Sequence, residues 1–377
     1  MIGSLADLKS STLSFATNLR GWKTRRKLLV IESDDWGAIR MPGPEAYHRL
    51  LDAGIGVDRS PYDRLDCLEN RNDFQALMNV IDAHRDASGR PATFTFNTVM
   101  GNPDFEAIEA DDFRRYHHQH LFESYQQYNG EDMEPDWRAA MESKLIQPQF
   151  HGREHLNVPL WMRDLQAGRA ETRIAFNHNF YGLTTKTSSP RQVNYLAAYW
   201  TESNAELDAA RERLRHGLSL FRQTFGFGSE TFIPCNYVFP DELQPLMTEH
   251  GVRLIQGQRG QFVPDPNGGK GRIRRSPTGQ KSGVGLRYSV RNVKFEPFED
   301  ESVDWVGRAL KEIAQAFALK TPAIISSHRV NYVGGMSTTH RDKCLGLLGQ
   351  LLIRIGSRWP DVEFVTSDEL LNAMESR

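Results

Sequence analysis

The chain has 377 residues, of which 39% are hydrophobic and 25% are charged, and its formal net charge is −2. These proportions are typical of a globular enzyme, and the length allows one large α/β domain or two smaller ones. The slightly negative charge argues against a nucleic-acid-binding protein, and no run approaches the ~18 apolar residues of a membrane-spanning helix.

The N-terminal segment and the cysteines bear on the compartment in which the protein works. Residues 1–19 mix charged residues with serines and lack the apolar stretch of a signal peptide. Cys67, Cys235 and Cys344 lie far apart and form no Cys-x-x-Cys pair. A sparse, odd number of cysteines is typical of reduced thiols, so we expect a cytoplasmic protein.

Short β-prone runs alternate with amphipathic segments along most of the chain. The expected strands are Leu28–Glu32, Ala92–Phe96, Leu145–Phe150, Thr231–Ile233, Val252–Ile255, Ala323–Ser326 and Val362–Val365. The expected helices are Asp73–Asp86, Trp137–Lys144, Val158–Gln166, Asn204–Thr224, Asp241–Glu249, Val303–Ala316 and His340–Arg358. This alternation predicts an α/β fold with a mostly parallel sheet, either open or closed into a barrel. We expect a single domain over residues 1–377, with insertions near residues 104–145 and 260–285.

Polar residues that are suited to catalysis follow several of these strands. Asp34 and Asp35 follow the first strand, His151 follows the third, and His328 follows the sixth. Ligands of parallel β/α proteins bind at the carboxyl ends of the strands, so we expect these side chains at one rim. Adjacent ionised aspartates repel each other, and burying them unpaired costs several kcal/mol, whereas a bound cation would relieve that cost.

His151 and His155 have the spacing of metal ligands. Two neutral imidazoles and one carboxylate form a common site for zinc or another divalent cation, with positions left open for water and substrate. A separation of four residues on a helical turn would bring both rings to one face. The sequence therefore predicts a metal-dependent hydrolase in which one carboxylate of Asp34 and Asp35 is a ligand and the other acts as a base.

The order of these motifs resembles the polysaccharide deacetylase family, which is carbohydrate esterase family 4 with its NodB-like domains. The matching motifs are Ile31–Asp35, which ends in Asp-Asp; His151–His155, a His-x-x-x-His; and Ser326–His328, a histidine after an apolar strand. These motifs fall between residue 28 and about residue 330, in the order found in the family.

The resemblance implies a distorted (β/α)7–8 barrel and one divalent metal ion held by Asp35, His151 and His155. It further implies Asp34 as the general base and His328 as the general acid that protonates a departing amine. The expected reaction removes an acetyl or similar acyl group from an N-acylated amino sugar or saccharide. Zn²⁺ is the first expectation for the metal, and Co²⁺, Ni²⁺, Mn²⁺ and Fe²⁺ suit the same ligand types.

Five further residues are candidates for substrate binding. Trp36, beside the aspartates, could stack on a sugar ring or equally pack in the core or at the rim, and Asn236 and Tyr237 follow the strand Thr231–Ile233. Arg329 and Asn331 follow the last histidine of the motif set and could position that histidine, bind substrate oxygens, or equally make only local hydrogen bonds within the loop.

Two positions depart from the family pattern. Gly152 stands where the family usually has Ser or Thr after the first histidine. Phe232–Tyr237 is the nearest counterpart of the Arg-x-Pro-Tyr/Trp motif, but it lacks the arginine. With the large insertions, these departures leave the substrate open among a polysaccharide, a lipid-linked sugar, a nucleotide sugar and a small amide.

Three other functions compete with this prediction. His151–His155 also fits the H-x-x-E-H motif of inverted zinc peptidases, with Glu154 as the base. Pro148 and Gly152 disfavour the helix that this motif requires, and the paired aspartates would have no role. A glycoside hydrolase on a related barrel would need two carboxylates across the scissile bond, and Asp34 is one candidate. A binding protein on a degenerate scaffold is the third alternative, and the intact ligand residues argue against it.

Two basic clusters lie outside these motifs, within residues 20–27 and 270–281. We expect both to be solvated surface, and an anionic ligand such as a phosphate on a carrier is the alternative.

Overall fold

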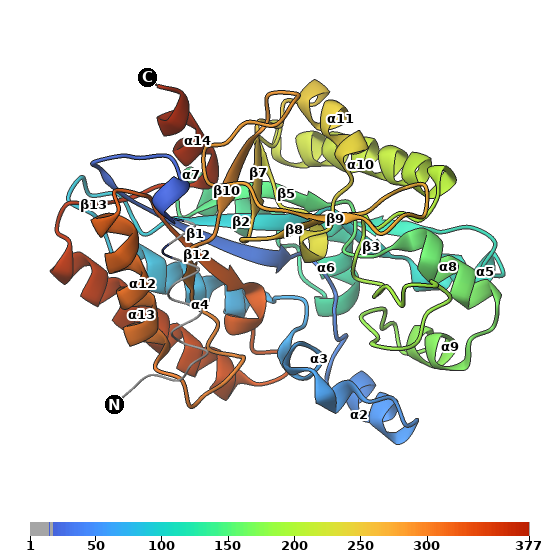
Figure 1. Cartoon of the computed structure of the whole chain (residues 1–377). Coiled ribbons are helices and arrows are strands. Elements are labelled where there is room, and N and C mark those ends of the chain that lie inside the picture. Colours follow the sequence, from blue (N-terminus) through green and yellow to red (C-terminus); the bar gives the residue numbers. More distant parts are fainter. Residues whose placement is uncertain (1–14, 16–17, 377) are drawn as a thin grey trace.

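A curled sheet of parallel strands runs through the centre of the computed structural model, which describes residue 15 and residues 18–376 (Figure 1). The neighbouring strands follow the order β10-β7-β6-β5-β2-β1-β12-β11, and every pair in this path is parallel. The strands are β1 (Lys27–Trp36), β2 (Phe94–Val99), β5 (Ile146–Gly152), β6 (Thr231–Phe232), β7 (Leu254–Gly257), β10 (Arg287–Val290), β11 (Val293–Lys294) and β12 (Ala323–His328), and β13 (Val362–Phe364) pairs with the start of β1.

The two ends of this path are joined by one short stretch of chain. β10 pairs with β7, and β11, which begins three residues after β10 ends, pairs with β12. Between them, the backbone N–H of Arg291 donates to Gly257 O (2.8 Å) and that of Asn292 donates to Ile324 O (3.1 Å). The segment therefore closes the sheet into a distorted barrel, which confirms the predicted fold class.

Helices pack outside the sheet on both sides, with α4, α12 and α13 on one side and α10 and α11 on the other (Figure 1). The α-helices are α2 (Pro44–Asp52), α3 (Pro61–Leu65), α4 (Arg71–Asp82), α5 (Phe105–Ala110), α6 (Leu121–Asn129), α7 (Glu134–Glu142), α8 (Val158–Gln166), α9 (Ala170–Phe176), α10 (Asn204–Phe225), α11 (Gln244–Glu249), α12 (Trp305–Ala318), α13 (Thr338–Arg358) and α14 (Ser367–Glu375). Short 3₁₀ turns are η1 (Val57–Arg59), η2 (Cys235–Tyr237), η3 (Asp241–Leu243) and η4 (Arg329–Asn331).

Helix α10 shows how the sequence specifies these elements. Its buried face consists of residues that recur at helical spacing, Leu207, Ala210, Leu214, Leu218 and Phe221. The hydroxyl of Ser203 caps the N-terminus by accepting from the backbone N–H of Glu206 (3.2 Å). The helix ends at Gly226, whose φ of 81° is the left-handed conformation that glycine adopts without strain.

The seven predicted strands and seven predicted helices all have counterparts in the structure, most of them shifted by a few residues at one end or both. Strands β10 and β11 were not predicted, because they are only a few residues long and are interrupted by Arg291 and Asn292. Their extended form depends on pairing with β7 and β12, which no local sequence window contains. Two antiparallel hairpins lie within or beside the predicted insertions, namely β3 (Gly101–Pro103) with β4 (His118–His120), and β8 (Gln261–Val263) with β9 (Arg272–Arg274).

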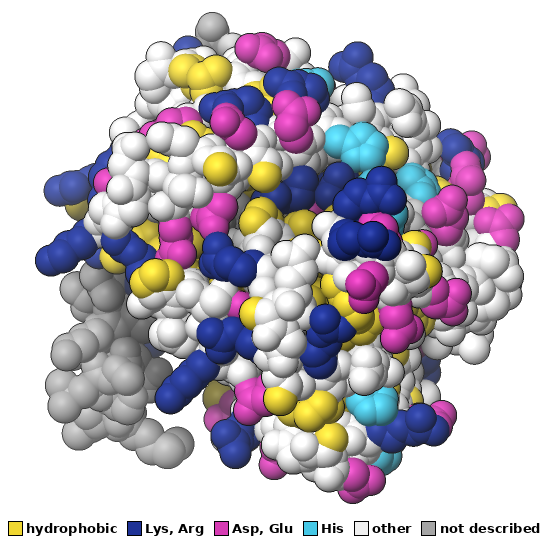
Figure 2. All heavy atoms as spheres, turned by 90° about the vertical axis from the view of Figure 1, so that its right-hand side faces the viewer, with side chains coloured by type: hydrophobic (Ala, Val, Ile, Leu, Met, Phe, Trp, Pro, Cys, Tyr) yellow, Lys and Arg dark blue, Asp and Glu magenta, His cyan; other side chains and the backbone are white. Residues whose placement is uncertain are grey.

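Several residues of the two predicted basic clusters are paired with acids on the surface. Arg26 binds Glu363 (2.6 Å), Lys27 binds Asp361, and Arg272 and Arg274 bind Asp241. Basic and acidic side chains are likewise interspersed over the face shown in Figure 2. In the described part of the chain, no helix is both long and apolar enough to traverse a bilayer. Most of the N-terminal segment on which the signal-peptide prediction rests, residues 1–14, 16 and 17, lies outside the described residues.

Candidate active site

A cavity of about 410 Å³ lies at the carboxyl ends of the barrel strands. Its lining combines the ends of β1, β5 and β12 with α3, η2 and loop residues, and it includes Asp34, Asp35, Arg40, Ser60, Tyr62, Asp63, His151, His155, Gly182, Thr184, Asn194, Leu196, Pro234, Asn236, Tyr237 and His328. The structure therefore brings together all five residues predicted for metal binding and catalysis, as well as Asn236 and Tyr237.

A bulge in β1 directs both aspartates into this cavity. Adjacent side chains of a regular strand point to opposite faces of the sheet. Ser33 is paired with Phe96 and Trp36 with Thr98, so β1 has one more residue than β2 over this stretch. Asp35 has a φ of 73°, which is uncommon for a residue other than glycine. The bulge and this left-handed residue break the alternation, and the two neighbouring carboxylates share one cavity.

A second bulge, in β5, places the first histidine. Thr98 is paired with Phe150 and Val99 with Gly152, which leaves His151 as the extra residue. Gly152 has a φ of 147°, and a Cβ at this position would lie 3.1 Å from the carbonyl oxygen of Glu154. Glycine thus allows the chain to turn sharply after the histidine, which gives a structural reason for the departure from the family pattern.

The prediction that His151 and His155 share a helical turn is wrong. His151 belongs to strand β5, and His155 lies in the loop before α8. The turn at Gly152 nevertheless brings the two rings to a centroid separation of 5.0 Å. The spacing predicted the proximity correctly, but the turn that produces it is not helical.

Asp35, His151 and His155 form a buried group with the dimensions of a metal site. Oδ1 of Asp35 lies 3.4 Å from Nε2 of His151 and 3.4 Å from Nε2 of His155. Ligands about 2.0–2.1 Å from a tetrahedral zinc ion are separated by about 3.4 Å, so each imidazole nitrogen lies at the distance from Oδ1 of Asp35 that two ligands of one cation would have. Nδ1 of His151 bonds to the carbonyl oxygen of Ile233 (2.8 Å), which orients Nε2 toward Asp35.

An unpaired carboxylate oxygen and the electrostatics fit a cation as well. Oδ1 of Asp35, the atom that faces both imidazoles, is buried and has no hydrogen-bond partner. Burial lowers the pKa of His155 to about 3, which keeps the imidazole neutral as a metal ligand must be. Burial opposes ionisation of Asp35, but the neighbouring imidazoles and Arg40 outweigh it and hold the pKa of Asp35 well below its ordinary value.

Cys235 is a metal-binding candidate that the sequence analysis missed. Its Sγ and ring nitrogens of His151 and His155 all lie within 4.8 Å of one another, so these three buried residues could hold a metal ion. The thiol donates to the carbonyl oxygen of His151 (3.1 Å). A lone cysteine beside Asn236 carries no metal-ligand spacing in the sequence, and only the fold brings it to the histidines.

Asp34 is held by a buried arginine. Nη1 and Nη2 of Arg291 donate to its two carboxylate oxygens, both at 2.6 Å, and Nδ2 of Asn97 donates to Oδ1 (2.8 Å). Nε of Arg291 donates to Glu32 (2.7 Å). Burial by itself raises the pKa of Asp34, but Arg291 outweighs it and holds that pKa at about 2. Asp34 is therefore an ionised carboxylate over the whole neutral range.

His328 lies opposite Asp34 in the cavity, and the other side of its ring is bound by the carboxylate of Glu296. Its Nδ1 bonds to Oε1 of Glu296 (2.7 Å), and its Nε2 lies 3.6 Å from Oδ2 of Asp34. Nδ2 of Asn331 donates to the other oxygen of Glu296 (2.9 Å). Burial by itself lowers the pKa of His328, but Glu296 and Asp34 outweigh it and raise that pKa to about 9. His328 therefore carries a proton at neutral pH.

Three of the predicted substrate-binding residues do not line the cavity, and these predictions are corrected. Trp36 is 1% exposed and stacks on Phe96 at a centroid distance of 3.7 Å, so it belongs to the core. Arg329 is fully buried and bonds to Asp66 and to Glu69.

Asn331 is the third, and it is also fully buried. Its Nδ2 donates to Glu296 and its Oδ1 accepts from the backbone N–H of Phe298 (3.0 Å), so its amide group is occupied within the protein. Asn331 therefore positions Glu296, in keeping with the alternative that it positions the histidine.

The peptidase alternative is contradicted by the position of Glu154. Its carboxylate accepts from Arg153 (2.5 and 3.0 Å), lies 3.5 Å from Nε of Arg213, and does not line the cavity. Residues 151–155 do not form the helix that the H-x-x-E-H motif needs.

Arg291, Glu296 and Asn97 are site residues that the sequence analysis missed. Arg291 and Glu296 come from the stretch around β10 and β11 that was not recognised as strand, and Asn97 lies within β2. The one signal in the sequence was Asn97, a polar residue inside an apolar strand, since a buried polar group needs a hydrogen-bond partner.

The sequence matches no protein-family model. No curated protein is significantly similar to it. Among solved structures, 4-alpha-glucanotransferase from Thermococcus litoralis aligns with a TM-score of 0.46 at 9% identity, over 93% of this chain and 40% of that one. A candidate polysaccharide deacetylase from Mycobacterium smegmatis aligns with a TM-score of 0.45 at 10% identity, over 94% and 92% of the two chains.

A carbohydrate esterase family 4 pseudoenzyme from Bacillus anthracis aligns with a TM-score of 0.35 at 10% identity, over 92% of this chain and 66% of that one. Of the glucanotransferase, the chain spans less than half the length.

The ion pairs of Arg291 generate a stability prediction. Replacing Arg291 with Met leaves two buried carboxylates, Glu32 and Asp34, without their cation, and we expect a loss of about 3–5 kcal/mol in the free energy of unfolding. The matched control is Arg26→Met, which removes an exposed pair with Glu363 and should cost at most about 1 kcal/mol. Urea denaturation measures both, and equal losses in the two variants would contradict the role given to Arg291.

Proposed function

We propose that the protein is a metal-dependent amide hydrolase that removes an acetyl or similar acyl group from an N-acylated amino sugar or saccharide. The observation that carries this proposal is the position of Asp35 Oδ1, 3.4 Å from two imidazole nitrogens, in the cavity that also holds Asp34 and His328. A metal site, an ionised carboxylate and a protonated imidazole around one cavity can supply the Lewis acid, the general base and the general acid for metal-assisted hydrolysis of an amide.

Asp35, His151 and His155 would hold the metal ion. We place Zn²⁺ first because two imidazoles and a carboxylate with open positions are a common catalytic zinc site, and Co²⁺, Ni²⁺, Mn²⁺ and Fe²⁺ suit the same donors. When bound, the cation supplies Lewis-acid polarisation of the acyl carbonyl and of the attacking water.

Asp34 is the proposed general base. Arg291 keeps its carboxylate ionised and fixes its orientation through two hydrogen bonds of 2.6 Å. The attacking water transfers a proton to this carboxylate as its oxygen forms a bond to the acyl carbon. Oδ1 already accepts from Arg291 and Asn97, whereas Oδ2 accepts from Arg291 and keeps a second lone pair that can take the proton.

His328 is the proposed general acid. Its Nδ1 is bound to Glu296 (2.7 Å), so the proton available for transfer is on Nε2, which faces the cavity. When the bond between the acyl carbon and nitrogen breaks, Nε2 donates this proton to the departing amine. Glu296 stabilises the cationic imidazolium before the transfer.

The lining of the cavity favours a polar substrate. Besides the catalytic groups, it presents the hydroxyl and amide groups of Ser60, Tyr62, Thr184, Asn194 and Asn236. Asn236 and Tyr237 both have left-handed backbones, with φ of 53° and 55°, and the turn η2 directs them to the rim. Side chains that donate and accept hydrogen bonds in a cavity of about 410 Å³ suit one sugar unit or a few.

Metal binding generates the first prediction. We expect the full chain to bind one divalent ion, and we expect Asp35→Ala and His155→Ala to weaken that binding by about 100-fold or more. This loss exceeds the one typical of residues that only hydrogen-bond to a metal ligand. Inductively coupled plasma analysis and competition with a chelator measure it. The control is His48→Ala, an exposed histidine of α2 outside the cavity lining. Activity that survives complete removal of the metal would point instead to a glycoside hydrolase with two carboxylates.

The role of Asp34 generates the second prediction. Asp34→Asn removes the proton acceptor, so we expect kcat for an N-acetylated saccharide to fall by about 10²–10⁴-fold while metal content is unchanged. Glu154→Gln is the matched control, because it alters a buried carboxylate between His151 and His155 that does not line the cavity, and most of the activity should remain. Turnover at the wild-type rate in Asp34→Asn would exclude Asp34 as the base.

The coupling of His328 to Glu296 generates the third prediction. A general acid must be protonated, so kcat/KM should fall as the pH rises through about 9, the pKa of His328. Glu296→Gln removes the charge that raises this pKa, and the alkaline limb of the pH profile should therefore move to lower pH. An unchanged alkaline limb in Glu296→Gln would show that His328 is not the group that titrates there.

A further inference from the structure

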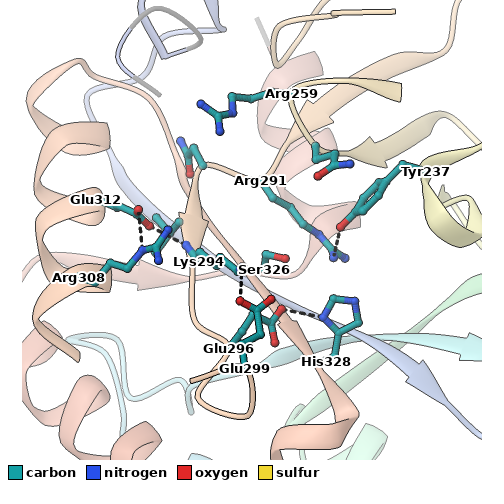
Figure 3. Close-up of a pocket in the computed structure, with 13 residues that line it drawn as sticks. Tyr237, Arg259, Arg291, Lys294, Glu296, Glu299, Arg308, Glu312, Ser326 and His328 are labelled. Atoms are coloured by element: carbon teal, nitrogen blue, oxygen red, sulfur yellow. Dashed lines mark hydrogen bonds and ion pairs between the residues drawn. The ribbon is translucent and has the colours of Figure 1, made fainter. Parts of the chain in front are cut away.

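One buried carboxylate in the cavity of about 410 Å³ has no part in the proposed steps. Asp63, in α3, lines this cavity and is 6% exposed. An adjoining cavity, drawn in Figure 3, shares His328 and Tyr237 with it, and several polar side chains there bind one another. Nδ1 of His328 is bonded to Glu296 (2.7 Å), and Nη1 of Arg291 donates to the hydroxyl of Tyr237 (3.2 Å). The carboxylate of Asp63 differs from these groups.

The carboxylate of Asp63 lacks a bonded partner within the protein. No described residue donates a hydrogen bond to it or forms an ion pair with it. Arg40 also lines the cavity, but its Nε forms an ion pair with Asp66 (3.3 Å). Burial raises the pKa of Asp63 to about 6, although Arg40 acts in the opposite direction. Asp63 is therefore ionised above that pH, and an ionised carboxylate that is buried without a donor opposes folding.

The place of Asp63 in its helix does not explain it. Asp63 is the third residue of α3, a position where an acid often accepts from the backbone N–H of the capping residue. Asp73, Glu123 and Glu369 accept in this way at the same position of α4, α6 and α14. In α3, Ser60 caps the helix by accepting from the backbone N–H of Asp63 (3.4 Å), and the carboxylate of Asp63 makes no bond in return. The helix therefore has no use for this carboxylate.

The loop between α9 and α10 supplies polar groups to the same cavity. A Cβ added at Gly182 would lie 3.9 Å from Oδ1 of Asp63, so the carboxylate lies beside this loop. Thr184 and Asn194 of the loop also line the cavity. Oδ1 of Asn194 accepts from the backbone N–H of Leu196 (2.7 Å), whereas its Nδ2 donates to no described residue. The cavity thus offers an accepting carboxylate and a donating amide, and a sugar hydroxyl both donates and accepts.

We propose that Asp63 binds hydroxyl groups of the sugar unit that carries the acyl group, and that it thereby selects a saccharide over a simple amide. This inference rests on the proposed function and narrows its substrate class. The two oxygens of a carboxylate can accept from two neighbouring hydroxyl groups at once. We expect neutral hydroxyl groups as the partner, and not a cationic group, because Arg40 already supplies a positive charge near Asp63.

Two acetamides that both carry a six-membered ring separate binding of hydroxyl groups from binding of the acyl group. N-acetylglucosamine has hydroxyl groups on its ring, and N-cyclohexylacetamide has none. Both are titrated into the full chain supplied with Zn²⁺, into Asp63→Asn and into Asp58→Asn, and ligand-observed NMR measures their affinities. Asp58 is an exposed acid of η1 outside the cavity lining, so its variant loses the same charge elsewhere.

We expect Asp63→Asn to bind N-acetylglucosamine about tenfold more weakly than the wild type, because hydrogen bonds to an ionised acceptor are stronger than those to an amide. N-cyclohexylacetamide should bind all three proteins equally, and Asp58→Asn should bind the sugar as the wild type does. Equal affinity of the wild type and Asp63→Asn for the sugar would overturn the proposal. An equal loss for both compounds, or a wild type that binds the sugar no more tightly than N-cyclohexylacetamide, would overturn it too.

Urea denaturation shows whether the fold itself uses this carboxylate. At about pH 8, above the pKa of Asp63, an unpaired buried carboxylate opposes folding. The urea midpoint of Asp63→Asn without ligand should therefore equal or exceed that of the wild type. A lower midpoint would show that Asp63 stabilises the fold, and it would overturn the assignment of this residue to a ligand.

Acetate appears in the same NMR spectra, and its release distinguishes this inference from the proposed function. We expect Asp63→Asn to raise KM for N-acetylglucosamine about tenfold and to leave kcat little changed. Sugar binding that depends on Asp63, without any release of acetate, would support this inference and count against the hydrolase. Release of acetate with the same KM in the wild type and in Asp63→Asn would count against this inference alone.

Discussion

The buried contact of Arg291 with Glu32 and Asp34 is the interaction on which both the barrel and its site depend. The arginine lies between β10 and β11, where one stretch of chain joins the two edges of the sheet. Its guanidinium compensates two carboxylates that burial would otherwise penalise by several kcal/mol each. The same hydrogen bonds that stabilise the closed barrel therefore keep Asp34 ionised and oriented. The stability of the barrel and the proposed chemistry thus both depend on the guanidinium of Arg291.

The two bulges are the second constraint, and they decide which side chains meet. A regular β1 would direct Asp34 and Asp35 to opposite faces of the sheet, and a regular β5 would not present His151 as an extra residue at its end. Each bulge inserts one residue opposite β2, on its two sides. Both bulges thus lie next to the central strand β2, and together they direct the carboxylate of Asp35 and the imidazole of His151 to the same point.

The site also separates the charges of its two proposed proton carriers. Oδ2 of Asp34 and Nε2 of His328 are 3.6 Å apart, yet the first residue is bound to an arginine and the second to a glutamate. Each partner favours the charged form of the residue that it binds, and the pKa values move apart to about 2 and about 9. One residue is consequently ready to accept a proton and the other to donate one at the same pH.

The sequence by itself determined the local features of this protein. Apolar runs and helical periodicity predicted the main strands and helices, and the residues that follow the strands predicted Asp34, Asp35, His151, His155 and His328 as one group. These predictions depend on short stretches of sequence, in which pattern and composition are sufficient.

Only the tertiary structure decided how these groups are supported. Arg291 lies 257 positions from Asp34 in the chain, and the register of β1 on β2 fixes the bulge that aims Asp35. The tertiary structure also places Trp36 in the core and pairs Arg329 and Asn331 with other residues of the protein. The sequence could not decide this, because a polar or aromatic residue beside a motif can face inward as readily as outward. Partners that are distant in the chain are chosen by long-range packing, which no local pattern encodes.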